Sequence, residues 1–209
     1  MAVSSLSRMT VPLASDQSQS TQGLLMPKLK YRFRVIFENF GVSTPRTELT
    51  KQVMDFTRPT VSFEPIDIPI YNSTIKLAGK YSWGDLTCNL RDDAGGNVSK
   101  LVGEQLQKQL DFMEQASASA GIDYKFISRL EVLDGANGAI EPVVLETWEL
   151  YGCFIQQANY NTLNYGTNEP VTISLTVRYD NAIQSPLTSG VGTNVGRAFG
   201  GGSVTGIGS

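Results

Sequence analysis

Residues 171–179 alternate strictly between apolar and polar side chains, and this pattern constrains the fold more than any other feature of the sequence. In a β-strand successive side chains point to opposite faces, so a period of two predicts a strand with one buried face. We expect Ile173, Leu175 and Val177 to enter a hydrophobic core. The hydroxyl side chains between them should lie on the opposite face, namely Thr172, Ser174 and Thr176.

Other segments extend this strand-rich pattern. Further runs typical of strands span residues 31–37, 52–57, 74–78, 85–91, 126–133 and 143–155. One segment has helical spacing instead, because apolar residues recur every three or four positions from Val98 to roughly Ser117. Several strands and one helix predict a mainly β fold, a small antiparallel β-barrel or sandwich with one flanking α-helix.

The segment from Arg58 to Tyr71 combines three prolines with an apolar series. Proline has no backbone N–H and therefore does not occupy a central strand. The prolines are Pro59, Pro65 and Pro69, and the apolar side chains are Val61, Phe63, Ile66, Ile68 and Ile70. We expect an extended loop or edge that needs a partner surface, because it is too apolar for a free loop.

The two ends of the chain differ from its middle. Residues 1–26 are rich in Ser, Thr and Gln without a period, and residues 186–209 are rich in Gly and Ser. The sequence therefore predicts an N-terminal arm over 1–26, a β-domain over 27–185 and a C-terminal arm over 186–209. Neither arm can build a core, so we expect at least one arm to cross to a neighbouring subunit.

Composition argues against several classes of function. The chain has no histidine, which excludes His-based catalysis and His metal sites, and its two cysteines, Cys88 and Cys153, lack metal-ligand spacing. A net charge of −3 and the lack of a Lys/Arg run argue against tight DNA binding. No stretch reaches the ~18 apolar residues of a membrane helix. We expect reduced cysteines, no cofactor, no metal, no membrane partner and no enzymatic activity.

Two pairs of carboxylates are the remaining catalytic candidates. Asp92 and Asp93 precede Gly95 and Gly96, where formation of a turn explains them. Glu146 and Glu149 are an odd number of residues apart on a predicted strand, so they should face opposite sides of the sheet. Neither pair has the facing arrangement that a glycosidase needs.

The most specific stretch of the sequence runs from Phe56 to Asp93. It contains Pro59, an Ile-Pro-Ile-Tyr step at 68–71, a basic strand ending in Ala78-Gly79, a Trp-Gly-Asp turn at 83–85 and Arg91-Asp92-Asp93. In this order the motifs resemble the tube-protein family of contractile bacteriophage tails. Residues 30–35, 146–155 and 171–179 are similar to other strands of that family. The resemblance covers about residues 27–182 and stops before both arms.

The resemblance implies a structural virion protein, made in the host cytoplasm and incorporated into the tail tube. Six-membered rings would stack head to tail into a hollow tube, through which the genome is ejected. The implied partners are further copies of the chain, the tail sheath, the baseplate and the tail terminator protein. The tape-measure protein and genomic DNA would pass through the lumen without tight binding.

Three sets of residues follow as candidate assembly sites within such a tube. The ring-stacking interface is predicted at Pro59, Phe63, Pro65, Ile66, Ile68 and Tyr71. The sheath-facing side of the helix is predicted to carry Lys100, Glu104, Lys108 and Glu114. The lumen-facing residues are predicted to be Thr172, Ser174 and Thr176, since small hydroxyls wet a wall without holding phosphate.

Two alternatives stay open at this point. One is the tube protein of a type VI secretion system, which has a related architecture and delivers effectors. The other is a carbohydrate-binding β-domain, which should place exposed aromatic side chains and facing carboxylates in one groove. A sugar-binding module would sediment as a monomer, whereas a tube protein forms rings or filaments.

Overall fold

The protein was analysed as a computed structural model, which describes residues 28–42, 47–134, 142–186, 190–192, 197–199 and 202–204. The first part of the chain contains β1 (Phe33–Glu38), α1 (Thr47–Lys51), β2 (Val53–Phe56), β3 (Val61–Ile70), β4 (Ser73–Trp83) and β5 (Leu86–Arg91). The middle contains α2 (Asn97–Gln109), β6 (Leu110–Asp111), β7 (Ala116–Ser117), α3 (Gly121–Tyr124) and β8 (Phe126–Leu133). The last part contains β9 (Val144–Asn159), β10 (Thr172–Arg178), β11 (Asn181–Pro186), β12 (Arg197–Phe199) and β13 (Gly202–Val204).

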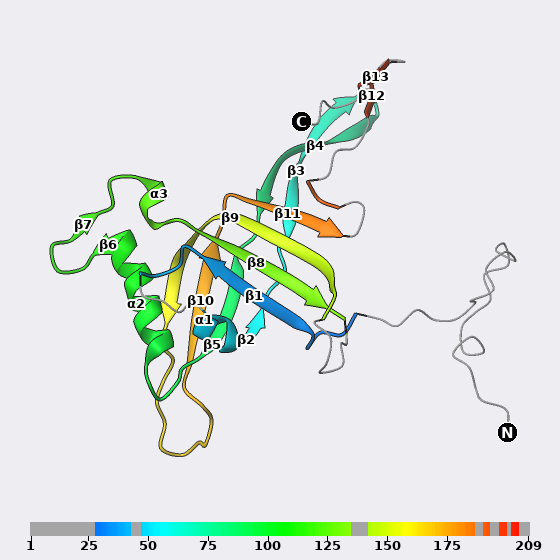
Figure 1. The fold of residues 1–209 in the computed structure, drawn as a ribbon. Helices are drawn as coiled ribbons and strands as arrows, with labels where there is room; N and C mark the ends of the chain where they lie inside the picture. The colour runs from blue at the N-terminus through cyan, green and yellow to red at the C-terminus, as the bar shows by residue number, and fades with distance from the viewer. Residues whose placement is uncertain are drawn as a thin grey trace, which may run out of the picture.

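One antiparallel sheet forms the body, with the strand order β1-β8-β9-β10-β5-β2 and β11 added beside β9 (Figure 1). The long strand β9 belongs to two halves of this sheet. Its first part pairs with β8 and β11, and its last part pairs with β10. The sheet bends at Gly152, whose φ of +67° favours glycine and where a Cβ would come within 2.1 Å of Asp180 Oδ2. This bend turns one sheet into two facing layers, as bulged strands do at the corners of sandwiches.

The expected mainly β fold with a sandwich-like core is confirmed. The barrel alternative is wrong for the single chain, because β1 and β2 are edge strands of the sheet and do not pair with each other. The described residues contain three helices where one was expected, because the short helices α1 and α3 accompany α2. The short strands β6 and β7, the strand β11 that pairs with β9, and the hairpin of β12 and β13 are also outside the prediction.

The core lies between the two layers and is closed by α2. Ile173, Leu175 and Val177 are buried as the alternating pattern predicts, and the hydroxyl residues between them lie on the other face. From the facing layer the core receives Val35, Phe37, Leu130 and Leu150. Both cysteines are free and buried, in agreement with their expected apolar surroundings.

Helix α2 is held on the body by two glutamine side chains that bond to backbone groups. Gln105 is fully buried; its Oε1 accepts from the Gly41 N–H at 3.0 Å and its Nε2 donates to the Tyr124 carbonyl at 2.6 Å. Gln109 bonds both the N–H and the carbonyl of Ile155, each at 2.9 Å. Its amide thereby replaces a neighbouring strand at an otherwise open part of β9.

The start of α2 explains the pair of aspartates, and its end corrects the prediction. Asp93 Oδ1 accepts from the N–H groups of Asn97 and Val98, so this carboxylate caps the helix N-terminus, as expected for a structural role. The helix ends at Gln109 and not near Ser117. Asp111 Oδ1 accepts from the Met113 N–H at 2.9 Å, and this local bond favours a turn over a further helical turn.

One carboxylate, Glu146, is buried on the core side of β9 with only 3% of its surface exposed. It forms an ion pair with Lys28 and accepts from Trp148 Nε1 at 2.7 Å and from Gln184 Nε2 at 2.8 Å. Burial by itself raises the pKa of Glu146, but hydrogen bonds from Lys28, Trp148 and Gln184 outweigh it, so the pKa lies below its ordinary value. Glu149 lies on the opposite face of the strand, as the spacing predicts.

We expect Glu146 to stabilise the fold in a pH-dependent way. Because its pKa is lower in the folded state, its contribution is present above the ordinary glutamate pKa of about 4.3 and is lost as pH falls through the folded value. Glu146→Gln should lower the free energy of unfolding by about 1–3 kcal/mol at pH 7. The difference in the free energy of unfolding between wild type and variant, measured by urea titration, should become smaller below about pH 4. Glu149→Gln is the matched control, and an equal effect of both variants would contradict this role.

Candidate assembly surfaces

The ribbon formed by β3 and β4 is the most unusual surface of the molecule. It extends away from the body as a two-stranded hairpin (Figure 1). Its central apolar side chains form cross-strand pairs, Ile66 with Leu77 and Ile68 with Ile75, on one face. All four are exposed, with between 40% and 51% of their surface accessible. A two-stranded hairpin is marginally stable alone in water, so this ribbon requires a covering surface.

The base of the ribbon is anchored to the body by a ladder of aromatic rings. Phe63 contacts Tyr81, Tyr81 contacts Trp83, and Trp83 contacts Tyr179 at the end of β10, with centroid separations of 5.7–6.4 Å. A bulge lies between Phe63 and Pro65, opposite Gly79. A Cβ at Gly79 would come within 2.5 Å of the Glu64 carbonyl oxygen, so glycine permits the close approach of the two strands.

The structure brings five of the six predicted stacking residues onto this ribbon. Pro59 precedes β3, four of the six lie within β3, and Tyr71 forms the turn with a φ of +50° and a fully exposed side chain. Ile66 and Ile68 share the apolar face, whereas Pro65 lies on the other side of the strand. Ile75 and Leu77 of β4 also belong to this apolar face but were not among the predicted residues, although their alternation with Thr74 and Lys76 was the available signal.

The second surface is the outer face of the layer formed by β5, β10 and the end of β9. The three predicted lumen residues lie together here. Ser174 is opposite Asn89 on one side and Asn159 on the other, and Thr176 is opposite Thr87 and Gln157. Hydroxyl and amide groups therefore cover its centre. Charges lie at its margins, where Arg178 pairs with Asp85 at 2.7 Å and Asp55 accepts from Asn89.

The outer face of the other layer has the opposite chemistry. Arg34 binds Glu131, and Arg129 contacts Glu149 at 3.1 Å and Glu38 at 3.4 Å. This network crosses β1, β8 and β9. The two outer faces of the sandwich therefore differ: one has hydroxyl and amide groups at its centre and charges at its margins, and the other is crossed by ion pairs.

Three of the four predicted sheath-facing residues lie on α2, and Glu114 does not. Lys100 is exposed and lies 3.9 Å from Glu104. Glu104 also accepts from the Val42 N–H, and Lys108 donates to the Asn39 carbonyl, so these two side chains contact the segment after β1. Glu114 is exposed in the turn between β6 and β7 because the helix ends before it.

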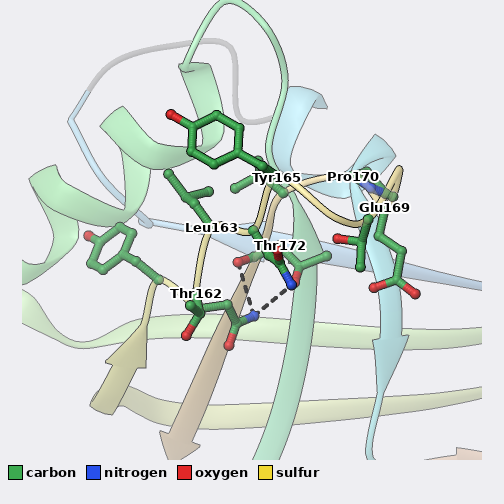
Figure 2. A pocket seen from close by; sticks show the side chains of 11 residues that line it. Thr162, Leu163, Tyr165, Glu169, Pro170 and Thr172 are labelled. Carbon is green, nitrogen blue, oxygen red and sulfur yellow. Dashed lines mark hydrogen bonds between the residues drawn. The ribbon is translucent and has the colours of Figure 1, made fainter.

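The loop between β9 and β10 surrounds a pocket of about 470 Å³ (Figure 2). Asn161 shapes the loop, since its Nδ2 donates to the Thr172 carbonyl at 3.0 Å and to Thr172 Oγ1 at 2.8 Å. Tyr165 is fully exposed at its rim. Glu169 is the one carboxylate among the lining residues, so the pocket lacks the facing pair of a glycosidase.

Among the described residues, no group of three or more His, Cys, Asp or Glu side chains could hold a metal ion. Among the described helices, none is long and apolar enough to cross a membrane.

No protein-family model matches the sequence, and no curated protein matches it. Solved structures do match the fold. A chain in the cryo-EM structure of the anti-feeding prophage baseplate, 6-fold symmetrised, aligns with a TM-score of 0.59 and 14% identity, covering 78% of this chain and 99% of that one. A chain in the sheath/tube terminator of an extracellular contractile injection system, PVC, in the extended state has a TM-score of 0.57 and 13% identity, covering 78% and 99%.

A third similar chain comes from the PVC sheath-tube complex in the extended state, with a TM-score of 0.53, 14% identity and coverage of 77% and 93%. At these identities the likeness shows the fold. The protein therefore has a fold found in components of contractile injection systems, which confirms the fold implied by the sequence motifs.

Proposed function

We propose that this chain is a structural subunit of the inner tube of a contractile tail or injection apparatus, and not an enzyme. The observation that carries the proposal is the exposed apolar ribbon of β3 and β4 on a body of this fold. A monomer would leave Ile66, Ile68, Ile75 and Leu77 in water, whereas a chain that always assembles covers them. The structures with similar folds come from baseplate, terminator and sheath-tube assemblies.

In this proposal six copies form a ring and rings stack through the ribbon. The face centred on Ser174 and Thr176 lines the channel, because its central hydroxyl and amide groups are hydrated but do not bind phosphate tightly. The ion-paired outer face and α2, with Lys100 at its surface, lie toward the sheath, where weak polar contacts allow sliding. Assembly into a virion that ejects DNA is the favoured setting, and effector delivery by a secretion tube is the alternative.

The division into an arm over 1–26, a domain over 27–185 and an arm over 186–209 is part of the same proposal. The body of the sheet ends with β11 at Pro186. The predicted contacts of the first arm lie outside the described residues. In the second arm, β12 and β13 pair with each other, which is consistent with a segment that is separate from the sheet of the body.

Negative-stain electron microscopy of the purified full chain tests the proposal. We expect six-fold rings or hollow tubes, and sedimentation at several protein concentrations should show species far heavier than the 22.8 kDa monomer. A stable monomer at all concentrations would refute a tube subunit and favour a sugar-binding domain. The DNA setting is tested separately by Ser174→Lys, which should leave tubes intact and slow genome ejection.

A further inference from the structure

A second apolar surface lies between the two edge strands of the sheet. A cleft of about 910 Å³ is lined by residues of β1, β2 and β8, by residues 28–32 before β1, by Thr50 of α1 and by Arg58 after β2. Its floor is formed by Phe33, Val35, Val53, Phe56, Leu130 and Val132. Met54 at its margin is exposed over 47% of its surface. The cleft exists because the sandwich does not close between β1 and β2.

The backbone of the strands on either side of the cleft also has an edge without strand partners among the described residues. β1 pairs on one side with β8, and β2 pairs on one side with β5, so each presents an unpaired edge within the described chain. Unpaired strand edges readily accept an added strand. An apolar floor between two free edges fits an extended segment with an apolar face.

The rim of the cleft carries a positive charge. Five basic side chains line it against one carboxylate, that of Asp55. Lys28 and Arg34 are neutralised by Glu146 and Glu131. The remaining three, Lys30, Arg32 and Arg58, form no ion pair with any described residue. The expected occupant is therefore extended, apolar on one face and acidic.

Strand β3 has these three properties. It is ten residues long and its apolar face contains Ile66 and Ile68. Its charged residues are Glu64 and Asp67, of which Asp67 lies opposite Lys76 of β4 and Glu64 has no lysine across from it in the described ribbon. Its backbone edge away from β4 is unpaired among the described strands. The ribbon extends away from its own body, which makes its own cleft a poor target (Figure 1).

We propose that β3 of one copy docks into the cleft between β1 and β2 of a second copy. This inference rests on the proposed tube function and names the surface that receives the ribbon. Ile66 and Ile68 pack on the floor near Val53 and Phe56, and the Glu64 carboxylate lies beside Lys30 and Arg58. Ribbon and cleft are different surfaces of one chain, so the contact is heterologous and propagates from copy to copy.

Cysteine pairs on different copies test the contact. Cys88 and Cys153 are buried, and burial raises the pKa of both thiols, that of Cys153 to about 12. Both therefore remain protonated near pH 8 and do not form disulfides in this experiment. Full-length Ile68→Cys and Met54→Cys are assembled as a mixture and oxidised gently. A disulfide requires Cα atoms within about 7 Å, so it reports direct docking.

The matched control replaces Met54→Cys with Tyr165→Cys on the β9–β10 loop, a more accessible site away from the cleft, so that slower linkage there cannot be explained by burial. We expect disulfide dimers in the first mixture to form about a hundredfold faster than in the control, because docked thiols reach a millimolar effective concentration. Neither Ile68→Cys nor Met54→Cys should dimerise alone. Leu77→Cys on β4 provides a second probe if Ile68→Cys disturbs the ribbon.

The outcomes separate this inference from the proposed function. Tubes without a 68–54 disulfide or a 77–54 disulfide, or with preferential linkage to position 165, would overturn the cleft as receiver and leave the tube function standing. Homodimers of Ile68→Cys alone would also overturn it, because they indicate ribbon against ribbon. Wild-type protein that forms neither rings nor tubes would overturn both.

Discussion

Replacing Leu175 with aspartate is expected to abolish folding of the chain. Leu175 is 1% exposed in the middle of β10, between Cys88 of β5 and Ala158 of β9. An unpaired carboxylate at this position has no described donor around it and would cost several kcal/mol, which is a large part of the 5–15 kcal/mol that stabilises a typical domain. Circular dichroism and the fraction of soluble protein measure the result.

The neighbouring position supplies a matched control. Thr176→Asp introduces the same carboxylate one residue further along the strand, on the outer face. We expect this variant to fold with a nearly unchanged melting temperature, because its carboxylate remains hydrated. Folding of Leu175→Asp, or loss of folding in Thr176→Asp, would contradict the assignment of the two faces.

Alternation explains why this part of the fold could be predicted from the sequence. A single period-two pattern identified the buried and exposed sides of β10, and the run 126–133 gave β8 with its observed bounds. Such a local pattern predicts the faces of a strand correctly because each strand buries one face in the same core. The end of α2 was mispredicted because Leu110 and Met113 continue the helical spacing, while the Asp111 turn and the Gln109 contact with β9 oppose it.

The assembly surfaces were only partly visible in the sequence. The prolines and isoleucines of β3 predicted a segment that needs a partner, but its pairing with β4 depends on register and on the bulge at Gly79. The cleft between β1 and β2 could not be predicted, because it arises from where the sheet bends and which strands remain at its edges. The buried roles of Gln105 and Glu146 likewise depend on partners distant in the sequence.

The double variant Ile66→Asp/Ile68→Asp should yield a folded, soluble protein that does not form tubes. The body should keep its stability, because both side chains are exposed and outside the core. Assembly should fail because two carboxylates would be placed where apolar surface has to be buried. Burying each carboxylate without a partner would make assembly less favourable by several kcal/mol. Melting curves measure the fold, and electron microscopy with sedimentation measures the assembly.

Thr74→Asp serves as the control for this variant, because the side chain of Thr74 lies on the other face of the ribbon from that of Ile75. It adds a carboxylate to the same ribbon without touching the apolar face, so tubes should form as in the wild type. Tube growth by the double variant would show that the ribbon is not the stacking element. Loss of tubes in both variants would instead indicate that both faces of the ribbon are buried in the assembly.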